Sequence, residues 1–178
     1  MPDKFYYKTV IAGDGGVGKT TLLHRYVKGI FLDDTRMTIG VEFFQEDVEV
    51  GREKMCALLI WDLGGQEQFR RLIDRYIIGT KGAMVMFDLT RQTTFHSIPK
   101  WVKILRQEDS ELPLILVAAK ADHEIKSSIK QEDIMRMKEK FNFFDYVKTS
   151  AKTGLNVQES FQALAKSILD HQNQYMAP

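Results

Sequence analysis

The stretch from Gly13 to Thr20, Gly-Asp-Gly-Gly-Val-Gly-Lys-Thr, constrains the fold of this chain more than any other feature. It matches the pattern G-x-x-x-x-G-K-[ST], in which a glycine-rich loop joins a strand to a helix and its backbone N–H groups converge on phosphate oxygens. In such a loop Lys19 reaches the β- and γ-phosphates as a point charge, and the Thr20 hydroxyl can ligate Mg²⁺. The predicted phosphate-binding residues are Gly15, Gly16, Val17, Gly18, Lys19, Thr20 and Thr21.

The same glycines also satisfy G-x-G-x-x-G, the fingerprint of dinucleotide-binding folds. That fingerprint does not require Lys19 and Thr20, and it needs an acidic residue about 20 residues later at the end of a second strand. Asp33 and Asp34 lie at that distance but follow a predicted helix. We therefore favour the phosphate-binding loop, which by itself leaves ATPases, nucleotide kinases and GTPases open.

Apolar, β-rich runs alternate with helical patterns along the chain, which is typical of βαβ units and a parallel sheet. The second strand alternates polar and apolar residues, and only Gly51–Lys54 separates it from the third, so a hairpin should place one antiparallel strand at the sheet edge. The predicted strands are Phe5–Ala12, Phe43–Val50, Met55–Trp61, Ala83–Asp88, Leu114–Ala119 and Asp145–Lys148. The predicted helices are Lys19–Lys28, Gln68–Ile77, Thr94–Gln107, Gln131–Phe141 and Val157–Gln172. The fold class is therefore α/β, with six strands and helices on both faces of the sheet.

Length and composition exclude several classes of function. A chain of 178 residues fits one domain, and a net charge of +1 gives no reason to expect nucleic-acid binding. Cys56 is the single cysteine and lies in an apolar run, so we expect a core residue and no disulfide. No secretory signal, no run of roughly 18 apolar residues and no C-terminal cysteine is visible. We expect a cytoplasmic monomer, and no direct membrane anchor is visible in the sequence given.

The third predicted strand ends in a second candidate phosphate element, Asp62-Leu63-Gly64-Gly65-Gln66. An aspartate at the end of a strand beside the phosphate-binding strand is where a second Mg²⁺-linked carboxylate belongs. Gly65 can bring a backbone N–H close to a γ-phosphate, and Gln66 can orient a water molecule.

With these motifs, the chain resembles the Ras superfamily of small GTPases, and most of all its Rab branch, from about Tyr7 to Leu169. The resemblance implies a single three-layer P-loop NTPase G domain over residues 1–178, with its core at about 7–169. It implies a molecular switch that binds GTP and GDP with Mg²⁺ and slowly hydrolyses GTP to GDP. Met37–Phe43 is similar to the first switch of Rab proteins, which assigns Thr38 to the γ-phosphate and the metal. Phe31 lies where the family stacks an aromatic ring on the base.

The reaction that the resemblance implies is an in-line attack of water on the γ-phosphate, catalysed by positioning and electrostatics. The implied catalytic residues are Lys19, Thr38, Gly65 and Gln66, and the implied metal ligands are Thr20, Thr38 and Asp62. The arginines at 70, 71 and 75 are expected to form a solvated or partner-facing helix surface, so none is assigned as an arginine finger in cis. Intrinsic hydrolysis should be slow and open to acceleration by an arginine supplied in trans.

The implied partners are effectors, exchange factors and GTPase-activating proteins that read the two switches. Phe43, Trp61 and Tyr76 match the aromatic triad through which Rab proteins meet effectors, although Phe43 and Trp61 could instead pack the sheet. Such partners would also place the protein at the periphery of a membrane, in membrane-trafficking-like signalling.

Two sequence segments match the family's base-reading loops. The strand Leu114–Ala119 runs into Lys120-Ala121-Asp122, similar to [NT]-K-x-D, and Ser150-Ala151-Lys152 is similar to S-A-K. A carboxylate at Asp122 accepts from the guanine N1–H and N2–H₂ groups, whereas adenine offers it no donor at those positions. Lys120, Asp122, Ser150, Ala151 and Lys152 are therefore the implied base-binding residues.

Two residues depart from the family pattern. Ala119 stands where the family has Asn or Thr. Losing the hydrogen bonds of the family's Asn side chain should cost roughly 1–3 kcal/mol of nucleotide affinity. Gly64 stands where Rab proteins usually have Ala, and its backbone freedom should raise the cost of ordering the second switch.

Other classes of function remain open at the level of sequence. A P-loop ATPase or nucleotide kinase would share Gly13–Thr20 but normally needs an acceptor-substrate lid or oligomer-supplied arginines, and no inserted lid is visible. A nucleotide-binding scaffold with little hydrolysis would keep Lys19 and lose Gln66 or Thr38, both of which are present.

Overall fold

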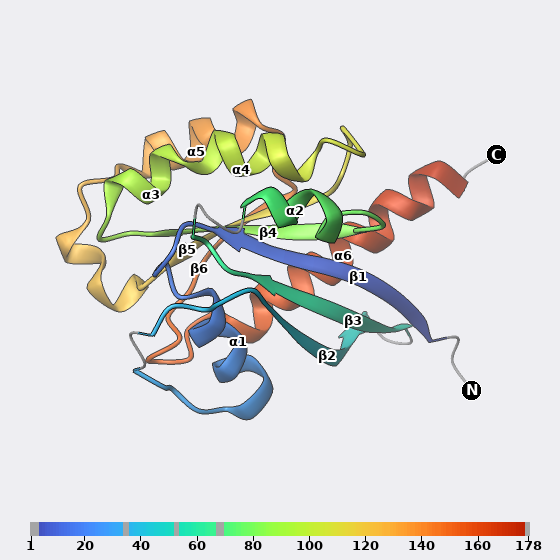
Figure 1. Cartoon of the computed structure of the whole chain (residues 1–178), viewed down its shortest axis with the longest axis horizontal. Coiled ribbons are helices and arrows are strands. Elements are labelled where there is room, and N and C mark those ends of the chain that lie inside the picture. Colours follow the sequence, from blue (N-terminus) through green and yellow to red (C-terminus); the bar gives the residue numbers. More distant parts are fainter. Residues whose placement is uncertain (1–3, 34–35, 52–53, 67–69, 177–178) are drawn as a thin grey trace.

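The computed structural model describes residues 4–33, 36–51, 54–66 and 70–176, and the predicted α/β fold is confirmed in it (Figure 1). The strands are β1 (Phe5–Gly13), β2 (Val41–Val50), β3 (Lys54–Leu63), β4 (Gly82–Asp88), β5 (Leu114–Ala119) and β6 (Asp145–Lys148). The helices are α1 (Lys19–Lys28), α2 (Arg70–Tyr76), α3 (Gln92–His96), α4 (Ile98–Leu105), α5 (Gln131–Lys140) and α6 (Val157–Met176). A short 3-10 helix over Ala121–Lys126 follows β5.

The six strands form one sheet in the order β2-β3-β1-β4-β5-β6. The β2 and β3 strands pair antiparallel, from Val41 opposite Leu63 to Val50 opposite Lys54, and every other pairing is parallel. The predicted hairpin and its antiparallel edge strand are therefore confirmed. The parallel order brings the carboxyl ends of β1, β3, β4 and β5 to the same edge, where ligands of such sheets bind.

Two hydrophobic cores lie on opposite faces of the sheet, because successive strand residues point to opposite sides. In β1, Tyr7 and Ile11 pack in the core beneath α1 and α6, whereas Val10 and Ala12 pack in the core beneath α2, α3, α4 and α5. Figure 1 shows the same two helical layers on either side of the strands. Cys56 is buried in the first of these cores, as predicted.

The predicted helix Thr94–Gln107 was wrong in its continuity, because the structure has two helices there, α3 and α4. Pro99 lies in the first turn of α4 and has no N–H with which to continue the hydrogen-bond ladder of α3. The helix predicted from Gln68 begins outside the described residues, and the described part is α2. Within the described part of the chain, no helix combines the length and hydropathy that crossing a membrane requires.

Candidate functional site

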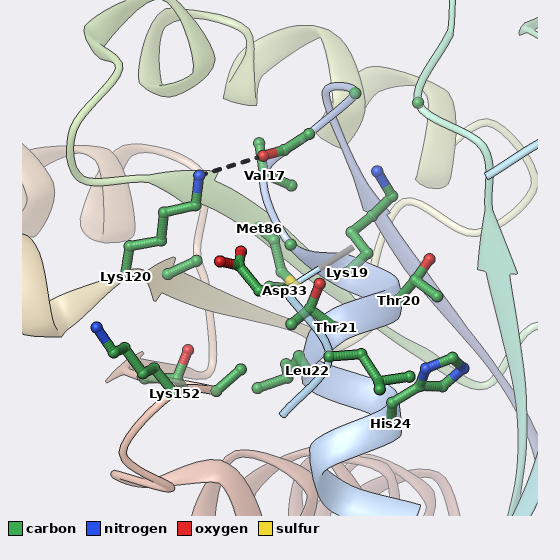
Figure 2. A pocket seen from close by; sticks show the side chains of 18 of the residues that line it. Val17, Lys19, Thr20, Thr21, Leu22, His24, Asp33, Met86, Lys120 and Lys152 are labelled. Carbon is green, nitrogen blue, oxygen red and sulfur yellow. Dashed lines mark hydrogen bonds between the residues drawn. The ribbon is translucent and has the colours of Figure 1, made fainter. Parts of the chain in front are cut away.

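A pocket of about 670 Å³ opens at the carboxyl edge of the sheet (Figure 2). Its walls come from segments that are far apart in the sequence but converge here. Among its lining residues are the predicted Gly15, Gly16, Val17, Gly18, Lys19, Thr20, Thr21, Phe31, Thr38, Gly65, Gln66, Lys120, Asp122, Ala151 and Lys152. The structure therefore brings together residues that the sequence assigned to one nucleotide site.

Lys19 is buried at the start of α1 and is held against the loop that precedes it. Its ammonium donates to the Gly13 carbonyl at 2.9 Å and to the Asp14 carbonyl at 3.1 Å. Burial lowers the pKa of Lys19 to about 8, while the nearby Asp62 and Asp14 carboxylates raise it. Asp14 is itself fixed, since the Trp101 indole donates to its carboxylate at 2.8 Å. Contacts with Lys19 and Trp101 thus hold the phosphate loop in place.

Three oxygen-bearing side chains meet beside this lysine: Thr20, Thr38 and Asp62. The Thr20 hydroxyl is hydrogen-bonded to the Asp62 carboxylate and to the Thr38 hydroxyl. Asp62 is fully buried, and burial raises the pKa of its carboxyl to about 6, opposed by Lys19 and by the Thr20 hydrogen bond. Its Oδ1 atom has no hydrogen-bond partner among the residues that the structure describes. A buried carboxylate with an unsatisfied oxygen, facing two hydroxyls, is a donor set that fits a hard divalent cation.

The segment after β3 lies directly against the phosphate loop. A Cβ atom at Gly65 would come within 2.4 Å of the Gly15 nitrogen and 2.6 Å of the Gly13 carbonyl oxygen, so only glycine fits this approach. The Gly64 N–H donates to the Gly40 carbonyl at 2.9 Å, which joins the two predicted switches. Met37 also reaches the phosphate loop, because its Cε atom would meet a Cβ added at Gly15 at 2.4 Å.

The two predicted base loops are joined to each other at the far end of the pocket. Lys120 has a left-handed backbone (φ 63°), and the Ala121 N–H donates to the Thr149 carbonyl at 3.0 Å. The buried Ser150 donates to the Asp122 carboxylate at 2.7 Å. Burial raises the pKa of Asp122, but the Ser150 hydrogen bond and nearby cations lower it by more, so the net pKa is below the ordinary value. The carboxylate is therefore ionised at neutral pH. Ser150 thus orients Asp122, while Ala151 and Lys152 line the cavity.

A Ras-family model matches residues 8–170 of the chain. The chain belongs to the Ras family. It is 36% identical to the Ras-related protein RABA1h of Arabidopsis thaliana, over 92% of this chain and 75% of that protein. It is 34% identical to the Ras-related protein Rab-19 of Xenopus laevis, over 94% of this chain and 79% of that protein. It is also 34% identical to the GTP-binding protein ypt3 of Schizosaccharomyces pombe, over 92% of this chain and 76% of that protein.

Family membership makes this chain a small GTPase, a GTP-binding switch that hydrolyses GTP. The predicted phosphate loop, the two predicted switches and the predicted base loops all lie within residues 8–170, the part of the chain that matches the Ras family and its G-domain fold. The mixed sheet of the chain, with one antiparallel pair, is the sheet of that fold.

The aromatic residues predicted to meet effectors form one cluster on the surface of β2, β3 and α2. The rings of Phe43 and Trp61 lie 4.5 Å apart, and those of Trp61 and Tyr76 lie 5.5 Å apart. Phe43 is 61% exposed, which is high for a phenylalanine, whereas Trp61 and Tyr76 are half-buried against the core. The ammonium of Lys8 lies 3.9 Å from the Trp61 ring centroid. The cluster thus both packs the sheet and presents an apolar surface.

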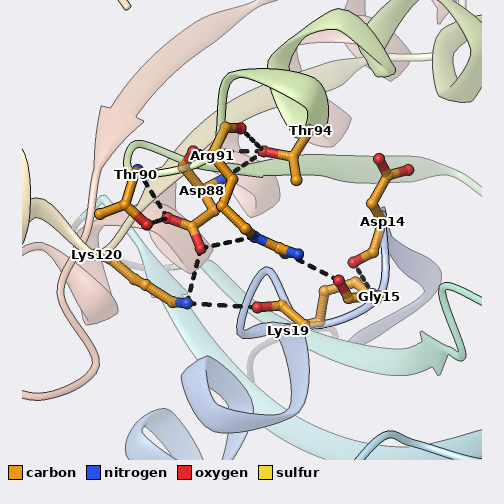
Figure 3. Close-up of polar contacts among 9 residues, drawn as sticks. Asp14, Gly15, Lys19, Asp88, Thr90, Arg91, Thr94 and Lys120 are labelled. Carbon is orange, nitrogen blue, oxygen red and sulfur yellow. Dashed lines mark hydrogen bonds and ion pairs between the residues drawn. The ribbon is translucent and has the colours of Figure 1, made fainter. Parts of the chain in front are cut away.

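Sequence reasoning missed the loop between β4 and α3, which also borders the pocket. Asp88 is buried at the end of β4, and it binds Thr90, Arg91 and Lys120 (Figure 3). A carboxylate at the end of a buried strand is a signal that could have identified Asp88. No local pattern marks Arg91, because its second partner is Gly15 of the phosphate loop, 76 residues away.

Proposed function

We propose that the pocket at the carboxyl edge of the sheet binds GTP and GDP together with Mg²⁺, and that the residues assigned from sequence carry this function. The observation that carries the proposal is that Lys19, Thr20 and Thr38 line one pocket and that Thr20 is hydrogen-bonded to the buried Asp62, whose Oδ1 atom is unsatisfied among the described residues. Thr20, Thr38 and Asp62 would hold the metal, whose chemistry is to neutralise phosphate charge and order the phosphate oxygens.

The hydrolytic role of the remaining residues follows from their positions. Lys19 lies beneath the glycine loop and supplies positive charge to the β- and γ-phosphates. Gly65 brings its backbone against the loop, and Gln66 lines the same cavity, where its amide can hold the attacking water in line. Arg71 and Arg75 are exposed on α2, which supports slow intrinsic hydrolysis that an arginine in trans would accelerate.

Base selection rests on Asp122. Its carboxylate is ionised and held by Ser150, so it accepts hydrogen bonds from guanine and repels the N1 acceptor of adenine. Each lost charged hydrogen bond is worth about 1.5–3 kcal/mol, which is sufficient for strong preference for guanine. Phe31 is 36% exposed and lines the pocket, which supports stacking on the base.

The switches and the aromatic cluster of Phe43, Trp61 and Tyr76 form the proposed effector surface. The Gly64–Gly40 hydrogen bond links both switches, so a γ-phosphate that orders one segment also biases the other. Exchange factors and GTPase-activating proteins would act on the same segments. The similarity to Rab proteins supports a monomer in membrane-trafficking-like signalling, brought to the periphery of a membrane through partners.

The decisive experiment is mass spectrometry of the nucleotide that co-purifies with the protein, combined with binding and turnover of GTP and ATP. We expect bound GDP or GTP, Mg²⁺-dependent retention, and slow GTP turnover. ATP turnover would indicate a P-loop ATPase or kinase. Tight guanine-nucleotide binding without turnover would indicate a scaffold.

A further inference from the structure

One carboxylate oxygen of Asp88 forms ion pairs with two cationic side chains. Lys120 Nζ lies 2.7 Å from Asp88 Oδ2, and Arg91 Nε lies 3.2 Å from the same atom. The other oxygen accepts from the Thr90 N–H at 2.8 Å and from the Thr90 hydroxyl at 2.7 Å. Every lone-pair direction of this buried carboxylate is thus engaged. Burial raises its pKa, but the Lys120 and Thr90 hydrogen bonds lower the pKa below the ordinary value, so Asp88 remains an anion.

Both cations also reach the phosphate loop (Figure 3). Arg91 Nη2 donates to the Gly15 carbonyl at 2.9 Å, and Lys120 Nζ lies 3.5 Å from the Gly16 carbonyl. The contacts close a ring that runs from the phosphate loop through Arg91, Asp88 and Lys120 and back to the loop. The end of β4, the base loop and the phosphate loop are therefore held by one polar network.

The Arg91 contact fixes the direction of a backbone N–H group that would donate a hydrogen bond to a phosphate. In a planar trans peptide the C=O and N–H bonds point in opposite directions. Holding the Gly15 oxygen outward against Arg91 therefore aims the Gly16 N–H the other way, toward the pocket. Both residues flanking this peptide are glycines, and Gly16 has a positive φ of 76°, so this is a peptide that could otherwise flip at little cost. Arg91 removes that freedom.

Ala119 cannot make a side-chain hydrogen bond that would join the base loop to the phosphate loop. It is buried at the end of β5, directly before Lys120, and its methyl group offers no hydrogen bond to the phosphate loop. The polar connections from the base loop to the phosphate loop instead start at Lys120, which reaches the Gly16 carbonyl directly and the Gly15 carbonyl through Asp88 and Arg91.

We propose that Arg91 is a positioning residue for nucleotide retention, which locks the Gly15–Gly16 peptide in its phosphate-binding orientation and couples it to the base loop. This inference rests on the proposed guanine-nucleotide site. The guanidinium lies on the carbonyl side of the loop, so it acts on the loop and does not contact the phosphates.

The test is the dissociation rate of a fluorescent GDP from the Mg²⁺-loaded protein, measured for wild type, Arg91→Ala and Arg91→Lys. We expect Arg91→Ala to release GDP roughly ten- to one-hundred-fold faster, the range for losing a charge-assisted hydrogen bond. Arg91→Lys should be intermediate, because an ammonium can pair with Asp88 or reach Gly15 but lacks the fork that does both. Arg136→Ala is the matched control, since Arg136 is an exposed arginine that pairs with Asp133 on α5.

A second readout separates positioning from general loss of structure. GMP and GDP are compared as competitors of fluorescent GDP, because both carry the base but only GDP carries the β-phosphate. We expect Arg91→Ala to weaken GDP more than GMP. Equal weakening of the two, or GDP release within twofold of wild type, would overturn the inference. If wild type bound no guanine nucleotide, the proposed function itself would fail, which is a different result from an unchanged Arg91 variant.

Discussion

The Ser150 hydroxyl donates a 2.7 Å hydrogen bond to the Asp122 carboxylate and so joins the two loops that read the base. The residues are 28 positions apart in sequence, and the hydroxyl is buried. The second oxygen of Asp122 lies 3.3 Å from Nε2 of His123. These two contacts therefore set the rotation of the carboxylate. Fixed orientation is what lets a single carboxylate discriminate between bases.

Replacing Asp122 by Asn should switch the preferred base. An amide keeps the size of the carboxylate but presents a donor, which matches the C2 carbonyl of xanthine and not the N2 amine of guanine. We expect Asp122→Asn to lose GDP affinity by at least about tenfold, equal to 1.4 kcal/mol, and to gain affinity for xanthosine diphosphate. Competition binding with both diphosphates measures the change. Retained GDP preference would show that another group reads the base.

Ser150→Ala should weaken GDP binding without changing the base preference. The variant leaves Asp122 in place but frees its rotation, which we expect to cost about 1 kcal/mol, the net worth of a typical hydrogen bond. Ser160→Ala is the matched control, because Ser160 is equally buried and donates to the Val157 carbonyl on α6. Equal GDP affinities of the two variants would contradict the role given to Ser150.

Ala119→Asn should slow GDP release, and more so when Arg91 is absent. An asparagine at this position can bond both the base and the phosphate loop, which is worth roughly 1–3 kcal/mol. If Arg91 already supplies the link to the loop, the gain should be smaller in wild type than in the Arg91→Ala background. A double-mutant cycle on GDP dissociation rates measures this coupling. Strictly additive effects would mean that the two positions act independently.

Gly64→Ala should move the first switch away from the second. A Cβ atom at Gly64 would lie 2.9 Å from the Thr38 carbonyl and 3.0 Å from the Gly40 carbonyl, both of them backbone atoms. Alanine would reduce the ordering cost by about 0.5–1 kcal/mol, but overpacking typically costs 1–3 kcal/mol, so the steric effect should dominate. We expect this steric effect to speed amide hydrogen exchange around Thr38 and Gly40. We also expect it to alter the difference in exchange of the second switch between nucleotide states. Unchanged exchange in both segments would contradict this expectation.

Removing divalent cations should accelerate GDP release from wild type by at least about tenfold, because the cation neutralises phosphate charge in the pocket. Asp62→Asn keeps the shape of the side chain but removes the anion, so chelation should then change the release rate by less than about threefold. The measurement is GDP dissociation with Mg²⁺ and with excess chelator. A chelator response as large in Asp62→Asn as in wild type would exclude Asp62 from the metal site.

Local sequence determined the elements and motifs of this protein. The Gly13–Thr20 loop was found from its spacing. The run into Lys120 and Asp122 and the Ser150–Lys152 segment were found from their resemblance to the family's base loops. The strands were equally readable, because apolar runs and period-two alternation reflect burial on each face of the sheet. The prediction of one helix over Thr94–Gln107 was wrong, because it followed the pattern of apolar residues and ignored the break that Pro99 marks between α3 and α4.

Tertiary structure alone decided how these motifs are held. Trp101 reaches Asp14 across 87 residues and Arg91 reaches Gly15 across 76, and both contacts exist because β4 pairs with β1 and brings α3 and α4 over the phosphate loop. Ser150 meets Asp122 because β6 pairs with β5, and Gly64 meets the carbonyls of Thr38 and Gly40 because β3 pairs with β2. Which chemical groups the chain carries follows from its sequence, whereas their orientation depends on long-range backbone pairing that no local pattern encodes.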